Sequence, residues 1–218
     1  MSKLLLFDFD GVIVDSLSVY ERTVKSCLEK IGHPIVQSRE DFLDLFEDNF
    51  YEGIVKRGVD LQEFVAASKD IQDEIHYEDL EPHRFLFPVL ESLYRDHVLA
   101  IISSNTSDII RRALDAYQID GYFEEILGSD TAYGKGEKIN LAMYLFGVAQ
   151  NRICYIGDTA GDIREARQAG VRAVGVTWGW HSPERLMAAH PDFMAERPED
   201  LFTYLESMVD ELSDFYIR

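Results

Sequence analysis

The chain has 218 residues, and 46% of them are hydrophobic, which is enough for one large core or for one core with a small second unit. The 40 acidic residues outnumber the 21 basic ones and give a formal net charge of -19, so the surface repels the phosphate backbone of a nucleic acid. No stretch approaches the roughly 20 apolar residues that a membrane-spanning helix needs. We therefore expect neither nucleic acid nor a membrane as a partner.

The N-terminus and the cysteines predict the compartment. The apolar run Leu4–Phe7 is too short for the core of a signal peptide, and no small-residue cleavage site follows it. Cys27 and Cys154 are isolated in apolar stretches, which favours buried thiols over a disulfide or a metal site. These features predict a cytoplasmic protein.

The first predicted strand, Leu4–Phe7, is followed by a long region in which no strand is predicted. From about Leu17 to Glu81, apolar residues recur at helical spacing in three runs, at 17–31, 42–54 and 61–75. This pattern predicts an all-helical insert of roughly 65 residues directly after the first strand, large enough for a small subdomain.

Strands and helices alternate in the rest of the chain. Short apolar runs predict further strands at 97–103, 152–157, 172–177 and 192–195. Helical spacing predicts helices around 89–94, 109–117, 139–146 and 163–169, the last ended by Gly170, and a closing helix within 198–218. The alternation predicts an α/β fold with a parallel sheet and right-handed crossovers.

Polar residues follow three of the predicted strands, at the sheet edge where open α/β sheets bind ligands. The first strand runs into Asp8-Phe9-Asp10-Gly11, the second into Ser103-Ser104-Asn105, and the third into Gly157-Asp158 with Asp162 four residues later. Lys135 lies between the second and third of these strands, in the predicted Gly-rich loop Tyr133–Gly136. The sequence thus predicts that carboxylates, a hydroxyl and a lysine meet at one edge.

Such a set suits a hard divalent cation, because Mg²⁺ binds a few carboxylates together with water and phosphate oxygens. Asp8 and Asp158 can supply carboxylates, and Asp10 can supply its backbone carbonyl. Asp162, at the start of the next helix, can hold metal-bound water from behind. The predicted metal site therefore comprises these four residues.

The same set suits a phosphoryl group. Ser103 and the amide of Ser104 can hold phosphoryl oxygens, and Lys135 can neutralise their charge. Asp8 is the predicted nucleophile, since carboxylates form acyl phosphates. Asp10 is the predicted acid and then base, two residues further on.

Each motif has a simpler interpretation when it stands alone. Asp-x-Asp-Gly is a common turn, and both Gly-Asp and Ser103–Asn105 can cap a following helix. A lysine between glycines is usually solvated, and Lys138 is an alternative to Lys135. The agreement of four motifs in order, each at the expected strand end, favours one shared site.

The four motifs resemble those of the haloacid dehalogenase-like hydrolases, especially the phosphoglycolate phosphatase-like branch. Asp8 to Ser16 (DFDGVIVDS) is similar to the first motif, Ser103 to the second, Lys135 to the third, and Gly157-Asp158 with Asp162 to the fourth. Gly136 stands where the family usually has a proline, so Lys138 stays open as the third-motif lysine.

The resemblance implies a Rossmann-like doubly wound core at 1–14 and 82–218 and a helical cap at 15–81 that closes over the substrate. It implies an Mg²⁺-dependent phosphatase that hydrolyses a small phosphomonoester, of phosphoglycolate or sugar-phosphate type, through an aspartyl-phosphate on Asp8. The expected partner is a small phosphorylated metabolite, and the chain is expected to be a monomer or homodimer.

Two rival functions stay open. A phosphosugar mutase keeps the acid at Asp10, and a non-enzymatic phosphoacceptor module also combines carboxylates, Mg²⁺, a hydroxyl and a lysine. Within the insert, Asn49, Lys56 and Arg57 are candidates to reach an anionic substrate, although such side chains are mostly solvated. Trp178–His181 is a candidate wall of the site, or simple aromatic packing.

Overall fold

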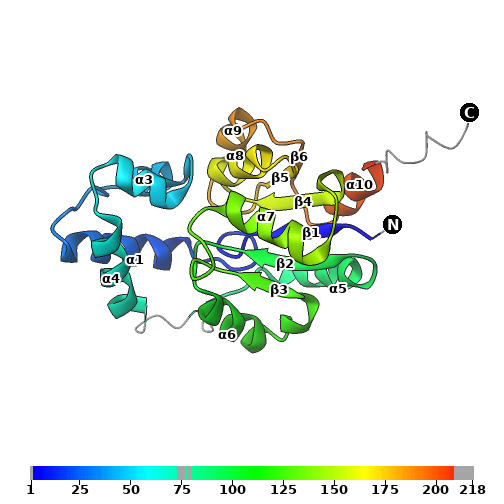
Figure 1. The fold of residues 1–218 in the computed structure, drawn as a ribbon, viewed down its shortest axis with the longest axis horizontal. Coiled ribbons are helices and arrows are strands. Elements are labelled where there is room, and N and C mark those ends of the chain that lie inside the picture. Colours follow the sequence, from blue (N-terminus) through cyan, green and yellow to red (C-terminus); the bar gives the residue numbers. More distant parts are fainter. Residues whose placement is uncertain (1, 73–76, 78–79, 209–218) are drawn as a thin grey trace, which may run out of the picture.

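The computed structural model describes residues 2–72, 77 and 80–208, and it contains one six-stranded parallel sheet (Figure 1). The strands are β1 (Leu4–Phe7), β2 (Val98–Ile102), β3 (Glu125–Leu127), β4 (Ile153–Gly157), β5 (Arg172–Val176) and β6 (Phe193–Ala195). Their order in the sheet is β3-β2-β1-β4-β5-β6. This is the order of a doubly wound, Rossmann-type sheet, so the predicted fold class is confirmed.

Helices cover both faces of this sheet. They are α5 (Phe87–Asp96), α6 (Ser107–Tyr117), α7 (Lys135–Phe146), α8 (Ala160–Gln168), α9 (Pro183–Ala188) and α10 (Asp200–Ser207). Successive side chains of a strand point to opposite faces, and β1 is fully buried on both. Leu5 and Phe7 pack in one apolar cluster with α5, α6 and α10. Leu4 and Leu6 pack in the other with α7, α8 and α9.

The strand order reverses at β1, which pairs with β2 on one side and β4 on the other. The chain moves outward to β3 in its first half and outward to β6 in its second half. In such sheets, the connections leave the carboxyl ends of the central strands on opposite sides and open a crevice there. The ends of β1, β2 and β4 therefore define the place for a site.

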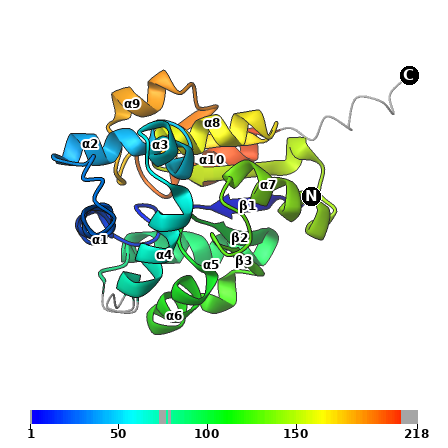
Figure 2. The ribbon, with the colours of Figure 1, turned by 60° about the vertical axis from the view of Figure 1, so that its left-hand side comes forward.

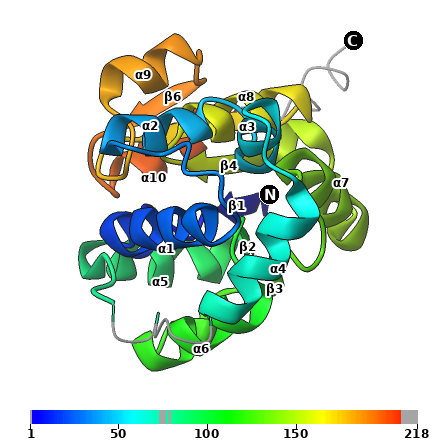
Figure 3. The ribbon, with the colours of Figure 1, turned by 90° about the vertical axis from the view of Figure 1, so that its left-hand side faces the viewer.

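Between β1 and β2 lies a helical insert, which Figure 1 shows beyond the arrowheads of the strands. Its helices are α1 (Leu17–Lys30), α2 (Arg39–Leu43), α3 (Phe50–Lys56) and α4 (Leu61–Gln72). Short 3-10 helices lie within the insert at Asp44–Phe46 and elsewhere in the chain at Arg84–Leu86, Asp120–Tyr122 and Gln150–Arg152. Figures 2 and 3 show α2 and α3 beside α8 and α9, with α1 and α4 on the opposite side of the strand ends.

The insert has an apolar cluster of its own, built around Phe42, Leu45 and Ile54, all fully buried. One core residue, Trp180, belongs to the same cluster. Its ring centroid lies 5.0 Å from that of Phe46. Aromatic packing therefore joins the insert to the segment that follows β5.

Ion pairs connect the insert to α8 and α9 of the core. Arg185 in α9 contacts Glu40, Asp44 and Glu47 of the insert at 2.7–2.8 Å. Arg164 in α8 contacts Glu47 at 2.9 Å. A partly exposed network of this size stabilises the contact more than isolated surface pairs do, and it weakens with salt.

Five of the strands and the main helices lie where the sequence predicted them. Gly170, with φ of 76°, follows α8 as expected for a residue that ends a helix. Among the strands and α-helices of the described core, two were missed. One is β3, which has three residues and lies at the edge of the sheet beside β2. The other is α9, although Ser182 caps it and Pro183 opens it, which is a readable start signal.

The predicted helix at 42–54 was wrong as one continuous helix. The α-helix α2 ends at Leu43 and a 3-10 turn follows at Asp44–Phe46, before Asn49, whose backbone is extended with ψ of 131°. Its side chain accepts hydrogen bonds from the amides of Tyr51 and Glu52 and starts α3 anew. The ends of two other predicted helices, 73–75 and 209–218, fall outside the described residues.

None of the helices in the described ranges combines the length and the apolar character that a membrane span requires.

Candidate active site

The first polar loop leaves β1 directly. The Asp8 amide donates to the Ile156 carbonyl of β4, which fixes the residue at the point where the strand order reverses. The Asp8 carboxylate accepts from the Phe9 amide at 2.8 Å through Oδ1. Asp10 follows two residues later and is also buried, and its Oδ1 has no hydrogen-bond partner.

Gly11 is required by both conformation and space. Its φ is 79°, in the left-handed region that favours glycine. A Cβ at this position would meet the Asp158 carboxylate and lie 2.9 Å from the Trp180 ring. The glycine lets the first loop approach Asp158 closely.

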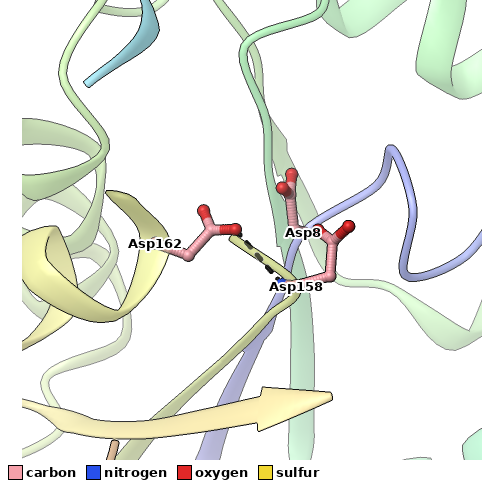
Figure 4. Close-up of side chains that lie close together, drawn as sticks. All are labelled: Asp8, Asp158 and Asp162. Atoms are coloured by element: carbon pink, nitrogen blue, oxygen red, sulfur yellow. Dashed lines mark hydrogen bonds between the residues drawn. The ribbon is translucent and has the colours of Figure 1, made fainter. Parts of the chain in front are cut away.

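Asp158 follows β4, and its carboxylate lies beside that of Asp8 (Figure 4). Oδ2 of Asp158 accepts from the Trp180 amide at 2.6 Å, whereas Oδ1 has no partner. The sequence offered Gly-Asp as a possible helix cap, but the cap of α8 is Thr159, which accepts from the Asp162 amide. Asp158 is therefore free to face the neighbouring carboxylates.

Asp162 is held rigidly at the start of α8. Its Oδ2 accepts from the amides of Asp158 and Thr159 and from the Thr159 hydroxyl, at 2.8–3.2 Å. Its Oδ1 accepts from Lys135 Nζ and, at 3.2 Å, from the Tyr155 hydroxyl. All acceptor directions of this carboxylate are thus used within the protein, which suits a supporting position.

Lys135 was predicted in a loop, and this was wrong: it is the first residue of α7, after Gly134 at the N-cap. The helix start carries its side chain to the carboxylates, where Nζ donates to Asp8 Oδ2 at 2.7 Å and to Asp162. Lys138, one turn later, donates instead to the Ser103 carbonyl at 2.6 Å. The geometry favours Lys135 for contact with Asp8.

Ser103 follows β2, and its hydroxyl lies 3.5 Å from Asp10 Oδ2. The Ser103 hydroxyl oxygen also accepts from the Asn105 amide at 3.0 Å, which fixes the turn. Ser104 presents its carbonyl to the Tyr51 hydroxyl of α3 at 2.9 Å. The second polar loop therefore contacts both the first loop and the insert.

Burial dominates the electrostatics of the site. It raises the pKa of Asp8 to about 7, against the opposing charge of Lys135, and it raises the pKa of Asp10 to about 6. The pKa of Asp158 lies well above its usual value because of burial and the nearby Asp162 and Asp8. Burial acts on Asp162 as well, but Lys135 and Thr159 outweigh it and lower its pKa.

Carboxylate oxygens of Asp8, Asp158 and Asp162 lie within 4.8 Å of one another. Three buried carboxylates at this separation repel one another, and Lys135 supplies a single positive charge. The unpartnered Oδ1 of Asp158 is an additional buried acceptor. These donors fit a hard divalent cation. Asp10 lies outside the carboxylate group, as expected if it contributes its backbone carbonyl.

The insert covers the carboxylates. A cavity of about 10 Å³ beside Asp8 and Asp10 has room for about one water molecule. Its outer walls are Tyr20 of α1, Phe46 and Trp180. Trp180 therefore belongs to the wall, as one interpretation of its segment held. The other tryptophan, Trp178, donates to the Val12 carbonyl at 3.3 Å.

Glu165 in α8 is a residue whose place the sequence did not predict. Its Oε1 accepts from the Lys135 amide at 2.7 Å and so holds the start of α7. Both of its oxygens also accept from Asn49 at 3.2 Å. Glu165 thus ties the lysine-bearing helix to the insert. Its position on the predicted helix that follows Asp158 and Asp162 was the available signal.

The insert residues considered for an anionic substrate lie elsewhere. Asn49 caps α3 and binds Glu165, as described above. Lys56 is exposed and pairs with Asp48 and Glu52 at 3.3 and 3.4 Å. Arg57 donates to the Gly53 and Asp44 carbonyls. None of the three lines the cavity beside Asp8.

The fold and the site together define a hydrolase with a doubly wound core and a carboxylate centre at the sheet's switch point. A model of the family described as haloacid dehalogenase-like hydrolase matches residues 5–176. The chain belongs to this family.

Proteins that are similar to this chain in sequence are named as phosphatases. A pyrophosphatase PpaX of Listeria innocua is 28% identical over 202 residues, covering 90% of this chain and 93% of the relative. A phosphoglycolate phosphatase of Synechococcus elongatus is 27% identical over 204 residues, covering 91% and 95%. The resemblance to the phosphoglycolate phosphatase-like branch is thereby confirmed.

Solved structures support the fold. A structure from Clostridium acetobutylicum, described as a predicted phosphatase, superposes with a TM-score of 0.82 at 20% identity and covers 95% of this chain and 99% of the other. At this level of identity, the likeness concerns the fold alone.

The pKa of Lys138 leads to a prediction about how the stability of the protein depends on pH. Burial lowers its pKa to about 8, with Lys135 acting in the same direction and Asp8, Glu165 and Asp130 opposing it. Between that value and the ordinary 10.5, the unfolded chain binds more protons at Lys138 than the folded chain. The free energy of unfolding of the wild type, relative to Lys138→Met, should therefore rise by about 2 kcal/mol from pH 7.5 to 9.5.

Urea unfolding of both proteins at the two pH values measures this difference. Lys69→Met, at an exposed position of α4, is the matched control and should show no such trend. A difference for Lys138→Met that stays constant with pH would contradict the prediction.

Proposed function

We propose that this chain is an Mg²⁺-dependent phosphatase that hydrolyses a small phosphomonoester through an aspartyl-phosphate on Asp8. The observation that supports this most directly is the convergence of Asp8, Asp10, Ser103 and Lys135 from separate segments on one buried cavity, with the Asp158 carboxylate beside that of Asp8. The phosphatase names of the relatives support the same activity.

Asp8 is the proposed nucleophile. Its Oδ1 is oriented by the Phe9 amide, and Lys135 lies on Oδ2, which favours the ionised form against the effect of burial. Attack forms a bond from a carboxylate oxygen to phosphorus and breaks the bond to the ester oxygen. Water then attacks phosphorus, releases inorganic phosphate and restores the carboxylate.

Asp10 is the proposed acid and base. Burial raises its pKa to about 6, so the carboxyl group can carry a proton near neutral pH. It would give this proton to the leaving alkoxide and then accept one from the attacking water. Its Oδ1 is without a hydrogen-bond partner and is therefore available for both transfers.

Ser103 with the amide of Ser104, together with Lys135, would hold the phosphoryl oxygens, since their segments line the cavity with Asp8. Asp8, Asp158 and the Asp10 backbone carbonyl would hold Mg²⁺, with Asp162 supporting them from behind. The bound ion would supply electrostatic stabilisation of the phosphoryl charge.

The insert, 15–81, is the proposed cap over a core formed by 1–14 and 82–218. The cavity beside Asp8 holds about one water molecule, so a substrate enters only when the insert moves away. Closure then excludes bulk water from the aspartyl-phosphate. The Asn49–Glu165 contact and the ion pairs of Arg185 are the contacts that must open.

The nucleophile is tested with Asp8→Asn. The variant should lose at least about 10³-fold in kcat for phosphate release from a panel of phosphoglycolate, pyrophosphate and sugar phosphates, because the amide cannot attack phosphorus. Asp115→Asn, at an exposed position of α6, should keep wild-type rates. Equal rates for Asp8→Asn and wild type would refute the assignment.

The same assay separates the rival functions. A mutase would convert one sugar phosphate into its isomer without net release of phosphate. A phosphoacceptor module would accumulate a long-lived acyl phosphate on Asp8 with no turnover. Either result would replace the phosphatase proposal.

Metal dependence is tested by chelation. Phosphate release should stop in excess EDTA and return when Mg²⁺ is added in excess of the chelator. Asp158→Asn should need at least about tenfold more Mg²⁺ for half of its own maximal rate, because a metal ligand is weakened. Full activity in EDTA would contradict the metal assignment.

A substitution at Gly161 tests whether the position of the insert over the core affects catalysis. This residue of α8 approaches the insert so closely that a Cβ would meet the Asp48 carbonyl and lie 2.9 Å from that of Phe46. Gly161→Ala should therefore displace the insert and lower kcat/KM by roughly tenfold to a hundredfold. Gly121→Ala, where a Cβ meets nothing within 4 Å, is the control. Unchanged kcat/KM in Gly161→Ala would show that exact seating is unnecessary.

A further inference from the structure

A second cavity of about 30 Å³ adjoins the cavity beside Asp8. Tyr20 and Ser104 line both cavities, so the two are neighbours. The second lies among α1, α3, α4 and the loop after β2. On the basis of the proposed function, we place the leaving group of the ester in this cavity, which shares wall residues with the cavity beside Asp8.

The walls of the second cavity are uncharged. They are built from aromatic and aliphatic side chains such as Phe64 and Val24, with the hydroxyls of Thr23 and Ser68 between them. Among the described residues that line it, none is acidic or basic. Across both cavities, the described lining contains one cation, Lys135, which already contacts Asp8 and Asp162.

None of the described basic residues of the insert lines either of these two cavities. Lys25 pairs with Glu21 at 2.7 Å, and Lys30 pairs with Asp70 at 2.7 Å. Lys56 and Arg57 contact partners away from both cavities, as described above. Among the described lining residues, a carboxylate or a second phosphate on the leaving group would therefore find no countercharge beyond Lys135.

One buried polar group in the second cavity has no close partner for its amide nitrogen. Asn105 is 2% exposed, and its Oδ1 accepts from the Thr106 amide at 3.0 Å, which fixes the orientation of the side chain. Its Nδ2 has no partner within 3.5 Å and has Asp10 and Tyr77 as its hydrogen-bonding neighbours at longer range. A buried donor of this kind is satisfied when a ligand brings an oxygen acceptor.

We propose that the second cavity receives an uncharged, hydroxyl-bearing leaving group of the sugar or polyol class, and that it discriminates against substrates with a second anionic group. Asn105 Nδ2 would donate to a hydroxyl oxygen of that leaving group. The closed cavity holds about two water molecules, so a larger alcohol enters while the insert is open. The chemistry of the walls, not their present volume, decides the selection.

A matched pair of esters tests this proposal in the presence of Mg²⁺. Glycerol 1-phosphate and 3-phosphoglycerate differ by a hydroxymethyl group in place of a carboxylate. We expect kcat/KM to be at least about tenfold higher for glycerol 1-phosphate, and ribose 5-phosphate to exceed phosphoglycolate and pyrophosphate in the same direction.

The outcomes separate this inference from the proposed function. A higher kcat/KM for 3-phosphoglycerate, phosphoglycolate or pyrophosphate would overturn the selectivity, while Asp8-dependent turnover would leave the phosphatase intact. Equal values for the matched pair would also overturn it. No Asp8-dependent phosphate release from any ester would refute both.

A positive charge introduced into the wall of the second cavity should shift the substrate preference toward the ester that carries a carboxylate. Thr23→Arg should raise kcat/KM for 3-phosphoglycerate relative to glycerol 1-phosphate by roughly tenfold, because the carboxylate gains a countercharge. Thr23→Gln, a long side chain without charge, should leave the ratio near the wild-type value. Ser68→Arg tests the opposite wall if Thr23→Arg does not fold. An unchanged ratio in a folded arginine variant would overturn the placement of the leaving group.

Asn105 is tested by comparing two esters. Asn105→Ala should lower kcat/KM for glycerol 1-phosphate severalfold more than for phenyl phosphate, whose leaving group has no further hydroxyl. A purely structural effect would lower both values equally, and that result would remove Asn105 from the proposal.

Discussion

Four buried carboxylates around one lysine are the constraint on which the rest of this structure depends. Asp8, Asp10, Asp158 and Asp162 lie within a region that has Lys135 as its contacting cation. Burial and mutual repulsion raise the pKa of three of them, and Asp162 alone is held low by its hydrogen bonds. This charge lies where the sheet order reverses, at the carboxyl ends of β1, β2 and β4 and the starts of α7 and α8. A local positive charge is what lets a protein of net charge -19 accept a phosphate.

The sequence predicted this centre well because strand ends are easy to read. Asp8, Ser103 and Asp158 each follow a short apolar run, and a parallel sheet brings such ends to one edge. Lys135 was harder, since the apolar spacing predicts its helix only from residue 139 and leaves the lysine in the Gly-rich segment before it. The choice between it and Lys138 needed the direction of α7, which points one amine at the carboxylates and the other at a carbonyl.

What the sequence did not predict depends on contacts between distant segments. The edge strand β3 has three residues and is stabilised by pairing with β2 rather than by a pattern of its own. Asn49 breaks a run of regularly spaced phenylalanines, because it caps α3 and binds Glu165 of the core. The unpartnered amide of Asn105 has no signature in composition or spacing. Each of these features is decided by where the insert sits over the sheet.

Trp180 couples the position of the insert to the carboxylates. Its backbone amide donates to Asp158 Oδ2, while its ring lies 5.0–5.7 Å from the rings of Tyr20, Phe42 and Phe46. Because Gly11 packs against both Trp180 and Asp158, the loop after β5 has little freedom to move alone. Withdrawal of the insert would remove most of the packing on one side of this ring and loosen the hydrogen bond that orients Asp158. The aromatic wall of the cavity beside Asp8 and the Asp158 carboxylate are therefore parts of one packed unit, so the position of the insert bears directly on the orientation of Asp158.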